Sequence, residues 1–203
     1  MQMLKDEIRE QIVIMAREEF FRKGFASASM RVIAEKAGVS VSNIYNYFNG
    51  KEEIFYTLTD SVSRSLEILI KNLLAFREGR DLDDEQFMHE FSERVSASVF
   101  SLIRQHRIEL LLILECSTGT KYAGVKNTLI ETLAAYFIEN MQKTAAARVD
   151  ALRQHSFLMR VLAMNLIQGL IEISRQYPDD AWVEKNIKSL LRYHIGGMMQ
   201  FFS

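Results

Sequence analysis

Small polar and aromatic side chains follow one another between Ser40 and Phe48, in the sequence SVSNIYNYF. Each asparagine amide in this stretch can offer a paired donor and acceptor to an adenine edge, and Val41 can pack on a thymine methyl group. If the stretch is a short helix, Ile44 and Phe48 lie four residues apart on one face. Their burial would turn the polar side chains outward, so the pattern predicts a helix whose exposed face contacts base edges.

The preceding residues have the right types to position such a helix. Ser27 or Ser29 can cap a helix that buries Met30, Ile33, Ala34 and Ala37, and Gly38 allows a tight turn before Ser40, which can cap the next helix. Two short helices joined by such a turn are typical of the helix-turn-helix motif, which reads the major groove with its second helix. The candidate DNA contacts, to bases and phosphates together, are Ser29, Arg31, Ser40, Val41, Ser42, Asn43, Tyr45, Asn46, Tyr47 and Lys51.

The whole chain has 203 residues, 48% of them hydrophobic and 25% charged, with a formal net charge of −1. Nucleic-acid binding therefore requires a local basic surface, and residues 1–51 carry eight Lys or Arg against six Asp or Glu, a net charge of about +2. One cysteine, Cys116, predicts no intrachain disulfide, and the first residues lack the pattern of a signal peptide. We expect a cytoplasmic protein.

Helical periodicity extends along the chain, and a single proline leaves long helices uninterrupted. The expected fold class is all-α, with about nine helices. An N-terminal three-helix DNA-binding domain at 1–50 is followed by a larger helical domain at 51–203 for ligand binding and dimerisation. Separate helices are expected at 84–104 and 107–116, the stretch 116–121 reads as a loop, and Asn49 with Glu52 resembles a capping box that starts the helix at 51–77.

Residues 8–58 resemble the TetR family of bacterial transcriptional regulators. The resemblance is carried at fixed spacing by Ile12, Phe20 and Gly24, by the run from Ser29 to Ser40, and by Ile44-Tyr45, Phe48 and Lys51-Glu52. Glu19 stands where the family usually has leucine, Ala28 replaces a common threonine, and Ser42 replaces a common glycine. The resemblance implies that Val41, Ser42, Asn43, Tyr45 and Asn46 face bases, and that Tyr47 and Lys51 face phosphates.

A single short reader helix gives little affinity, so the chain should also carry a surface for a second copy. The last helix has an apolar stripe with two adjacent glycines, which would suit the close approach of another helix. The candidate interface residues are Ile187, Leu191, Ile195, Gly196, Met198, Met199 and Phe202. The resemblance further implies a ligand cavity in the C-terminal domain, with candidate lining residues Phe91, His106, Glu109, Cys116, Tyr122, His155, Phe157, Met159, Met164, Asn165 and Gln168.

Residue patterns for catalysis are weak. The four histidines lack the spacing of a helical zinc site, and neither a Gly-rich phosphate loop nor a nucleophile elbow occurs in the sequence. We therefore expect no catalytic residues, no bound metal and no cofactor.

The sequence thus predicts a homodimeric regulator, a repressor that a small apolar or amphipathic effector releases from a palindromic operator. Two alternatives stay open: a DNA-binding organiser of the same fold without small-molecule control, and a helical enzyme or carrier for a lipid-like molecule.

Overall fold

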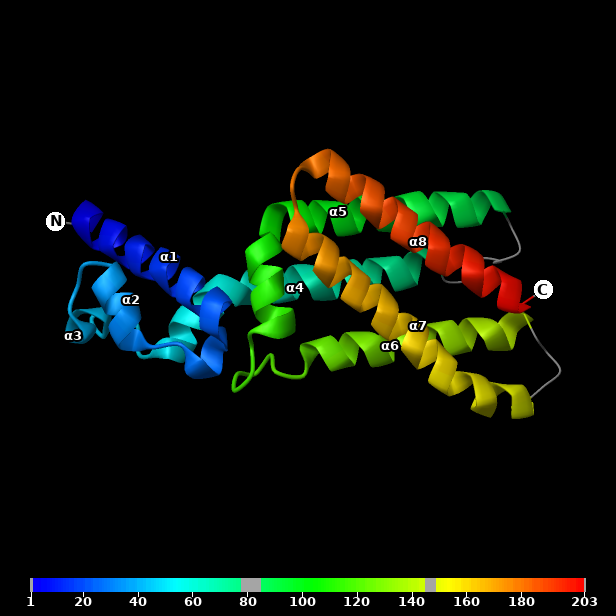
Figure 1. Cartoon of the computed structure of the whole chain (residues 1–203), viewed down its shortest axis with the longest axis horizontal. Coiled ribbons are helices and arrows are strands. Elements are labelled where there is room, and N and C mark those ends of the chain that lie inside the picture. The colour runs from blue at the N-terminus through cyan, green and yellow to red at the C-terminus, as the bar shows by residue number, and fades with distance from the viewer. Residues whose placement is uncertain (1, 78–84, 145–148, 203) are drawn as a thin grey trace. The chain divides into compact units, whose positions relative to one another are not determined.

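The computed structural model describes residues 2–77, 85–144 and 149–202, and all the regular structure in these ranges is helical (Figure 1). Side chains are described for these ranges except at 2–4, 74, 76, 77, 85, 140–144, 149–155 and 198–202. The helices are α1 (Gln2–Ser27), α2 (Met30–Lys36), α3 (Val41–Ile44), α4 (Lys51–Arg77), α5 (Glu85–Glu115), α6 (Val125–Thr144), α7 (Val149–Gln176) and α8 (Asp180–Phe202). The predicted all-α class is confirmed.

The chain forms two compact units. Unit 1 comprises residues 1–68 and 106–125, and unit 2 comprises residues 69–105 and 126–203. Both α4 and α5 contribute residues to each unit, because the dividing points fall inside these two long helices. The predicted boundary at residue 50 separates a DNA-binding domain from a domain for ligand binding and dimerisation, and it stays a prediction.

Aromatic side chains fill the core of unit 1. The rings of Phe20, Phe25 and Phe55 form a triangle whose centroids lie 5.2–5.8 Å apart, and Phe55 meets the other two edge-on. All three are at least 96% buried, and complete burial of one such side chain contributes about 1.5–3 kcal/mol. This cluster fixes the end of α1 against the start of α4.

Unit 1 also includes the chain after α5. The Phe25 amide donates to the Cys116 carbonyl over 2.8 Å, at a point where Gly24 leaves helical geometry with φ of 74°. Helical geometry is interrupted at Gly24, where glycine accepts the positive φ at no steric cost, and a short further stretch of α1 follows to Ser27.

The described residues form eight helices, close to the predicted nine. Residues 84–104 and 107–116 were expected to form separate helices. The two stretches are joined in α5, but the backbone leaves helical geometry at His106, where φ is −138° and ψ is 30°, so the interruption falls where the sequence predicted a break. The start of α4 differs in detail, since Glu53 and not Glu52 receives hydrogen bonds from the Asn49 backbone amide and side chain, over 2.6 and 2.8 Å.

Unit 2 contains the packed pair α7 and α8. Gly169 lets the two helices approach closely, because a Cβ added there would lie 2.8 Å from Cδ2 of Leu190. Asp179 caps α8 by accepting from the Trp182 amide over 2.8 Å. By length and composition, the segment Ser156–Gln176 of α7 could cross a membrane, with a mean hydropathy of 1.4. Only 22% of the most apolar window in that segment is buried in the structure.

Candidate nucleic-acid interface

Residues 40–48, here called the reader segment, begin with a capped turn. The Ser40 hydroxyl accepts from the Asn43 amide over 3.1 Å, which confirms the predicted cap. After Ile44 the chain continues in turns, and the amides of Tyr47 and Phe48 both donate to the Ile44 carbonyl. The regular helix is therefore shorter than expected, but the turns hold the following residues in place.

The reader segment has one buried and one exposed side. Ile44 is fully buried and Phe48 is 99% buried, whereas Tyr45 is 56% exposed. Ser42 and Asn46 are also exposed, and Val41 and Asn43 are half-buried. Hydrogen-bonding and aromatic groups thus gather on the outward side, as the spacing of Ile44 and Phe48 predicted.

The two asparagines of the reader segment are linked. The Asn46 side-chain amide donates to the Asn43 side-chain oxygen over 3.1 Å. An asparagine side chain has two donors and one oxygen with two lone pairs, so this bond uses only part of their capacity. The bond restrains both side chains before any partner arrives, which lowers the entropy lost on contact with a base.

Three of the predicted phosphate contacts lie around this surface. Arg31 is exposed on α2, and Ser29 and Tyr47 are half-buried. Ser29 stands at the N-cap position of α2, but its hydroxyl makes no capping hydrogen bond.

Lys51 has intramolecular partners that the sequence did not reveal. Its ammonium group donates to the carbonyls of Ala28, over 3.1 Å, and Ala26, over 3.3 Å. It also lies 4.6 Å from the centre of the Phe25 ring. Lys51 therefore ties the start of α4 to the end of α1, whatever further contact it makes with a phosphate.

The predicted ligand residues are divided between the units. Glu109, Cys116 and Tyr122 lie in unit 1, as does His106 at the bend of α5, whereas the other seven lie in unit 2. In unit 2 Met159 is fully buried, Phe91 and Gln168 are half-buried, and Phe157, Met164 and Asn165 are exposed. The side chain of His155 lies outside those described.

Several of these residues have partners within the protein. Glu109 pairs with Arg17 over 3.2 Å, and Gln168 accepts from Lys126 over 2.9 Å and donates to Glu172 over 2.8 Å. The position of a polar residue on an apolar helix therefore did not distinguish a side chain that contacts a ligand from one that bonds within the protein.

Tyr122 belongs to a polar cluster with Asp60, Lys121 and Tyr56. The Tyr122 hydroxyl donates to Asp60 over 2.6 Å, and the Lys121 ammonium lies 2.9 Å from the same carboxylate oxygen. The ammonium also lies 4.3 Å from the centre of the Tyr56 ring. Burial raises the pKa of Asp60, but hydrogen bonds from Tyr122 and Lys121 outweigh it and hold that pKa below its usual value.

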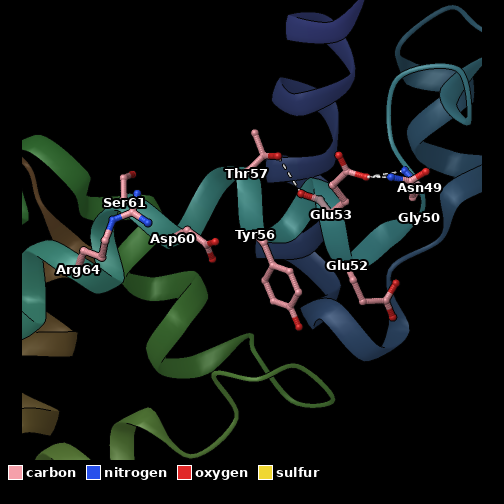
Figure 2. A pocket seen from close by; sticks show the side chains of 9 residues that line it. All are labelled: Asn49, Gly50, Glu52, Glu53, Tyr56, Thr57, Asp60, Ser61 and Arg64. Atoms are coloured by element: carbon pink, nitrogen blue, oxygen red, sulfur yellow. Dashed lines mark hydrogen bonds between the residues drawn. The ribbon is translucent and has the colours of Figure 1, made fainter.

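An open groove of about 580 Å³ lies along the first part of α4, beside this cluster (Figure 2). Its lining includes three carboxylates, from Glu52, Glu53 and Asp60, and the guanidinium of Arg64. This excess of negative charge repels a phosphate backbone, so the groove and the reader segment are surfaces of different character. No sequence motif marks the groove, because most of its residues are spread along one amphipathic helix.

The predicted dimer residues also differ in their surroundings. Ile187 is fully buried and Leu191 is 96% buried within this single chain, Ile195 is half-buried, and Gly196 is exposed. The side chains of Met198, Met199 and Phe202 lie outside those described. Among the side chains described in unit 2, the most exposed large apolar ones are instead Phe157, Tyr193 and Met164.

Comparison with known proteins relates the N-terminal part of the chain to one family. Residues 12–57 match the family model described as bacterial regulatory proteins, tetR family. The probable HTH-type transcriptional regulator ArpR of Pseudomonas putida is 31% identical over 110 residues, which are 54% of this chain and 51% of that protein. The HTH-type transcriptional regulator TtgR of the same species is 37% identical over 65 residues, covering 32% of this chain and 31% of TtgR. The chain thus matches about half or less of the length of these relatives.

Solved structures share the fold over nearly the whole chain. A TetR-like transcriptional regulator from Rhodococcus sp. RHA1 has a TM-score of 0.55 at 16% identity, covering 94% of this chain and 96% of its own. The fatty acid degradation regulator FadR from Bacillus halodurans has a TM-score of 0.54 at 19% identity, covering 94% and 95%. These relatives and neighbours are described as regulators. The sequence likeness to the TetR family of bacterial regulatory proteins covers residues 12–57, and the likeness to the solved structures shows a shared fold over nearly the whole chain.

Proposed function

We propose that the protein is a cytoplasmic DNA-binding transcriptional regulator that inserts its reader segment into the major groove. The observation that carries the proposal is the burial of Ile44 and Phe48, which leaves Tyr45, Ser42 and Asn46 exposed on the opposite side. Similarity to regulators over the same residues supports it.

In this proposal the side chains have separate tasks. Asn43 and Asn46 read adenine edges and Val41 packs on a thymine methyl group, while Ser42 and Tyr45 contact neighbouring bases. Ser29, Arg31 and Tyr47 hold phosphates and thereby set the register of the reader segment on the duplex.

We further propose that two copies bind together. One reader segment offers few base contacts, whereas two copies related by a twofold axis reach half-sites about 34 Å apart. A helix that is apolar on most faces must be covered, and α7 is both apolar and largely exposed, with Phe157 and Met164 at its surface. Because Ile187 and Leu191 are already buried, the proposed interface uses the exposed face of α7 together with Tyr193 and Gly196 of α8.

We also propose that unit 2 takes a small apolar or amphipathic effector, and that the regulator acts as a repressor. Phe91 and Met159 remain the candidate contacts, since methionine adapts to irregular ligands. The effector favours a state of the dimer that no longer fits the operator, so effector affinity and operator affinity must change by the same factor.

Selection of bound fragments from random duplex DNA tests the proposed function. The expected result is one enriched motif with two inverted half-sites whose centres lie about one helical turn apart. Enrichment of no motif, at a salt concentration that suppresses non-specific binding, would contradict the proposal. A DNA-binding organiser would give the motif but no effector that changes its affinity.

A further inference from the structure

The buried face of α1 becomes basic toward the N-terminus of the helix. Ile12, Ala16 and Phe20 are fully buried and recur every four residues on the side of α1 that packs within unit 1. At the same helical spacing, the next positions toward the N-terminus are Arg9 and Lys5, and both side chains are exposed. The fully buried stretch of α1 therefore ends at Ile12, and the helix extends beyond it with two cations on its inner side.

The first of these cations contacts the reader segment. The central carbon of the Arg9 guanidinium lies 5.0 Å from the centre of the Phe48 ring, and Phe48 is the last residue of the reader segment. Because the Phe48 side chain is almost fully buried, the core holds its ring in place. The contact therefore keeps the Arg9 side chain at the edge of the reader segment, next to the turn that carries Tyr47.

The positive charge of Arg9 is not neutralised by a carboxylate of the described residues, among which it makes neither an ion pair nor a hydrogen bond. The other two arginines of α1 are engaged within the protein. Arg17 pairs with Glu109 over 3.2 Å. Arg22 pairs with the buried Glu19 over 2.7 Å. Burial raises the pKa of Glu19, but the hydrogen bond and charge of Arg22 are the main opposing effects, and the pKa lies below its usual value.

The contact with a ring also leaves the hydrogen-bond donors of Arg9 unused. A guanidinium has five N–H donors in one plane, and an aromatic ring offers no lone pair in return. Two of these donors match the spacing of phosphate oxygens, so that arginine binds phosphate through two parallel hydrogen bonds. Lys5 adds a second exposed positive charge about one helical turn away.

We propose that Arg9 is a phosphate contact of the DNA interface, contributed by α1 and held in place by the Phe48 ring. It binds the backbone of the duplex beside the bases that the reader segment contacts. This inference rests on the proposed function, because it adds a further helix to that interface. Since phosphates carry no sequence information, Arg9 contributes to the affinity for every sequence and not to the choice of bases.

Three substitutions test the contact. Arg9→Gln removes the charge, and Arg9→Lys keeps the charge without the planar donors. Lys23→Gln is the matched control, because Lys23 is an exposed cation on the same helix, about 21 Å from Arg9 at 1.5 Å per residue. That distance exceeds the Debye length of about 10 Å at 0.1 M salt. All three changes are at exposed side chains, so melting temperatures should stay within about 4 °C of wild type.

The readout is the affinity for a selected duplex and for a scrambled duplex of the same length, measured between 50 and 200 mM salt. Loss of one phosphate contact should lower the slope of log affinity against log salt concentration by about 0.9. We expect this decrease in Arg9→Gln, with binding to both duplexes weakened by the same factor, about five- to tenfold at 0.1 M salt. Arg9→Lys should keep the wild-type slope, and Lys23→Gln should match wild type in slope and affinity.

A wild-type slope in Arg9→Gln would overturn the phosphate contact. The same decrease in Arg9→Lys or in Lys23→Gln would also overturn it, because the effect would then not depend on a charge at this position. A loss of affinity for the selected duplex alone would show base recognition instead. If wild type bound the selected and the scrambled duplex equally, the proposed function itself would be refuted, while the salt slope on either duplex would still judge Arg9.

Discussion

Replacement of Lys51 by methionine removes its ammonium group and keeps most of the apolar length of the side chain. In the structure this group donates to the carbonyls of Ala26 and Ala28 and lies over the Phe25 ring. Hydrogen bonds to a charged group contribute about 1.5–3 kcal/mol, and a cation over an exposed ring about 0.5–1 kcal/mol. Because Lys51 is only half-buried, we take the lower values and expect a loss of about 2 kcal/mol.

A loss of that size corresponds to a fall in melting temperature of about 4–8 °C for a chain of this length. Thermal unfolding followed by circular dichroism measures it. The control is Lys71→Met, which makes the same change at an exposed position on the same helix and should melt within about 1 °C of wild type. Equal melting temperatures for the two variants would refute the bonds assigned to Lys51.

The same pair of variants tests the phosphate contact predicted from the sequence. If the Lys51 ammonium also faces a phosphate, Lys51→Met should weaken binding to every duplex and lower the salt slope by about one, measured well below its melting temperature. If Lys51→Met lowers the melting temperature but leaves the salt slope unchanged, the Lys51 ammonium bonds only within the protein and does not contact a phosphate.

Three further results follow from the structure. Since the folded-state pKa of Glu19 lies below its ordinary value of 4.5, its stabilisation is full above that pH and is lost as pH falls through the folded-state pKa. In denaturant titrations, the free energy of unfolding of wild type should therefore exceed that of Glu19→Gln near neutral pH, and the difference should shrink in acid. A difference in unfolding free energy that stays the same at every pH would contradict this. Asp60→Asn should cost about 1 kcal/mol, a value reduced for partial exposure, and should be non-additive with Tyr122→Phe in a double-mutant cycle. Additive losses would show that the Asp60–Tyr122 hydrogen bond contributes nothing. Gly169→Ala should destabilise by about 1 kcal/mol because its Cβ meets Leu190, yet should stabilise in a Leu190→Ala background, where the clash is gone and alanine favours the helix; the same sign in both backgrounds would refute the close approach.

Local patterns were sufficient to predict most helices. The helix predicted at 51–77 is α4 with the same bounds, and Ser40 was identified as a cap from its type and position. These signals lie within a few residues of the structure they determine. The break predicted between residues 104 and 107 corresponds to the interruption of α5 at His106.

The exposed face of the reader segment was also predictable, because Ile44 and Phe48 decide it within one helical turn. The long-range hydrogen bonds that hold the neighbouring elements in place were not predictable. Lys51 finds its carbonyl partners more than 20 residues away, and Tyr122 reaches Asp60 across 62 residues. Periodicity identifies a face that must be covered, but it does not say what covers it.

The last helix illustrates the same limit. Its apolar stripe was assigned to a second copy, yet Ile187 and Leu191 are buried within the single chain. The exposed Phe157 of α7 had instead been assigned to a ligand cavity. Only the packing of α7 on α8 distinguishes the side of each helix that the chain covers itself.

The central claim is that the outward face of the reader segment recognises base edges. Relative affinities of wild type and Asn43→Ala for every single-base variant of the selected half-site test it most directly. The account predicts that Asn43→Ala loses about 1–3 kcal/mol of discrimination at one base pair and keeps the wild-type preferences elsewhere. An Asn43→Ala profile that matches wild type at every position, with equally silent changes at Asn46 and Val41, would contradict the account.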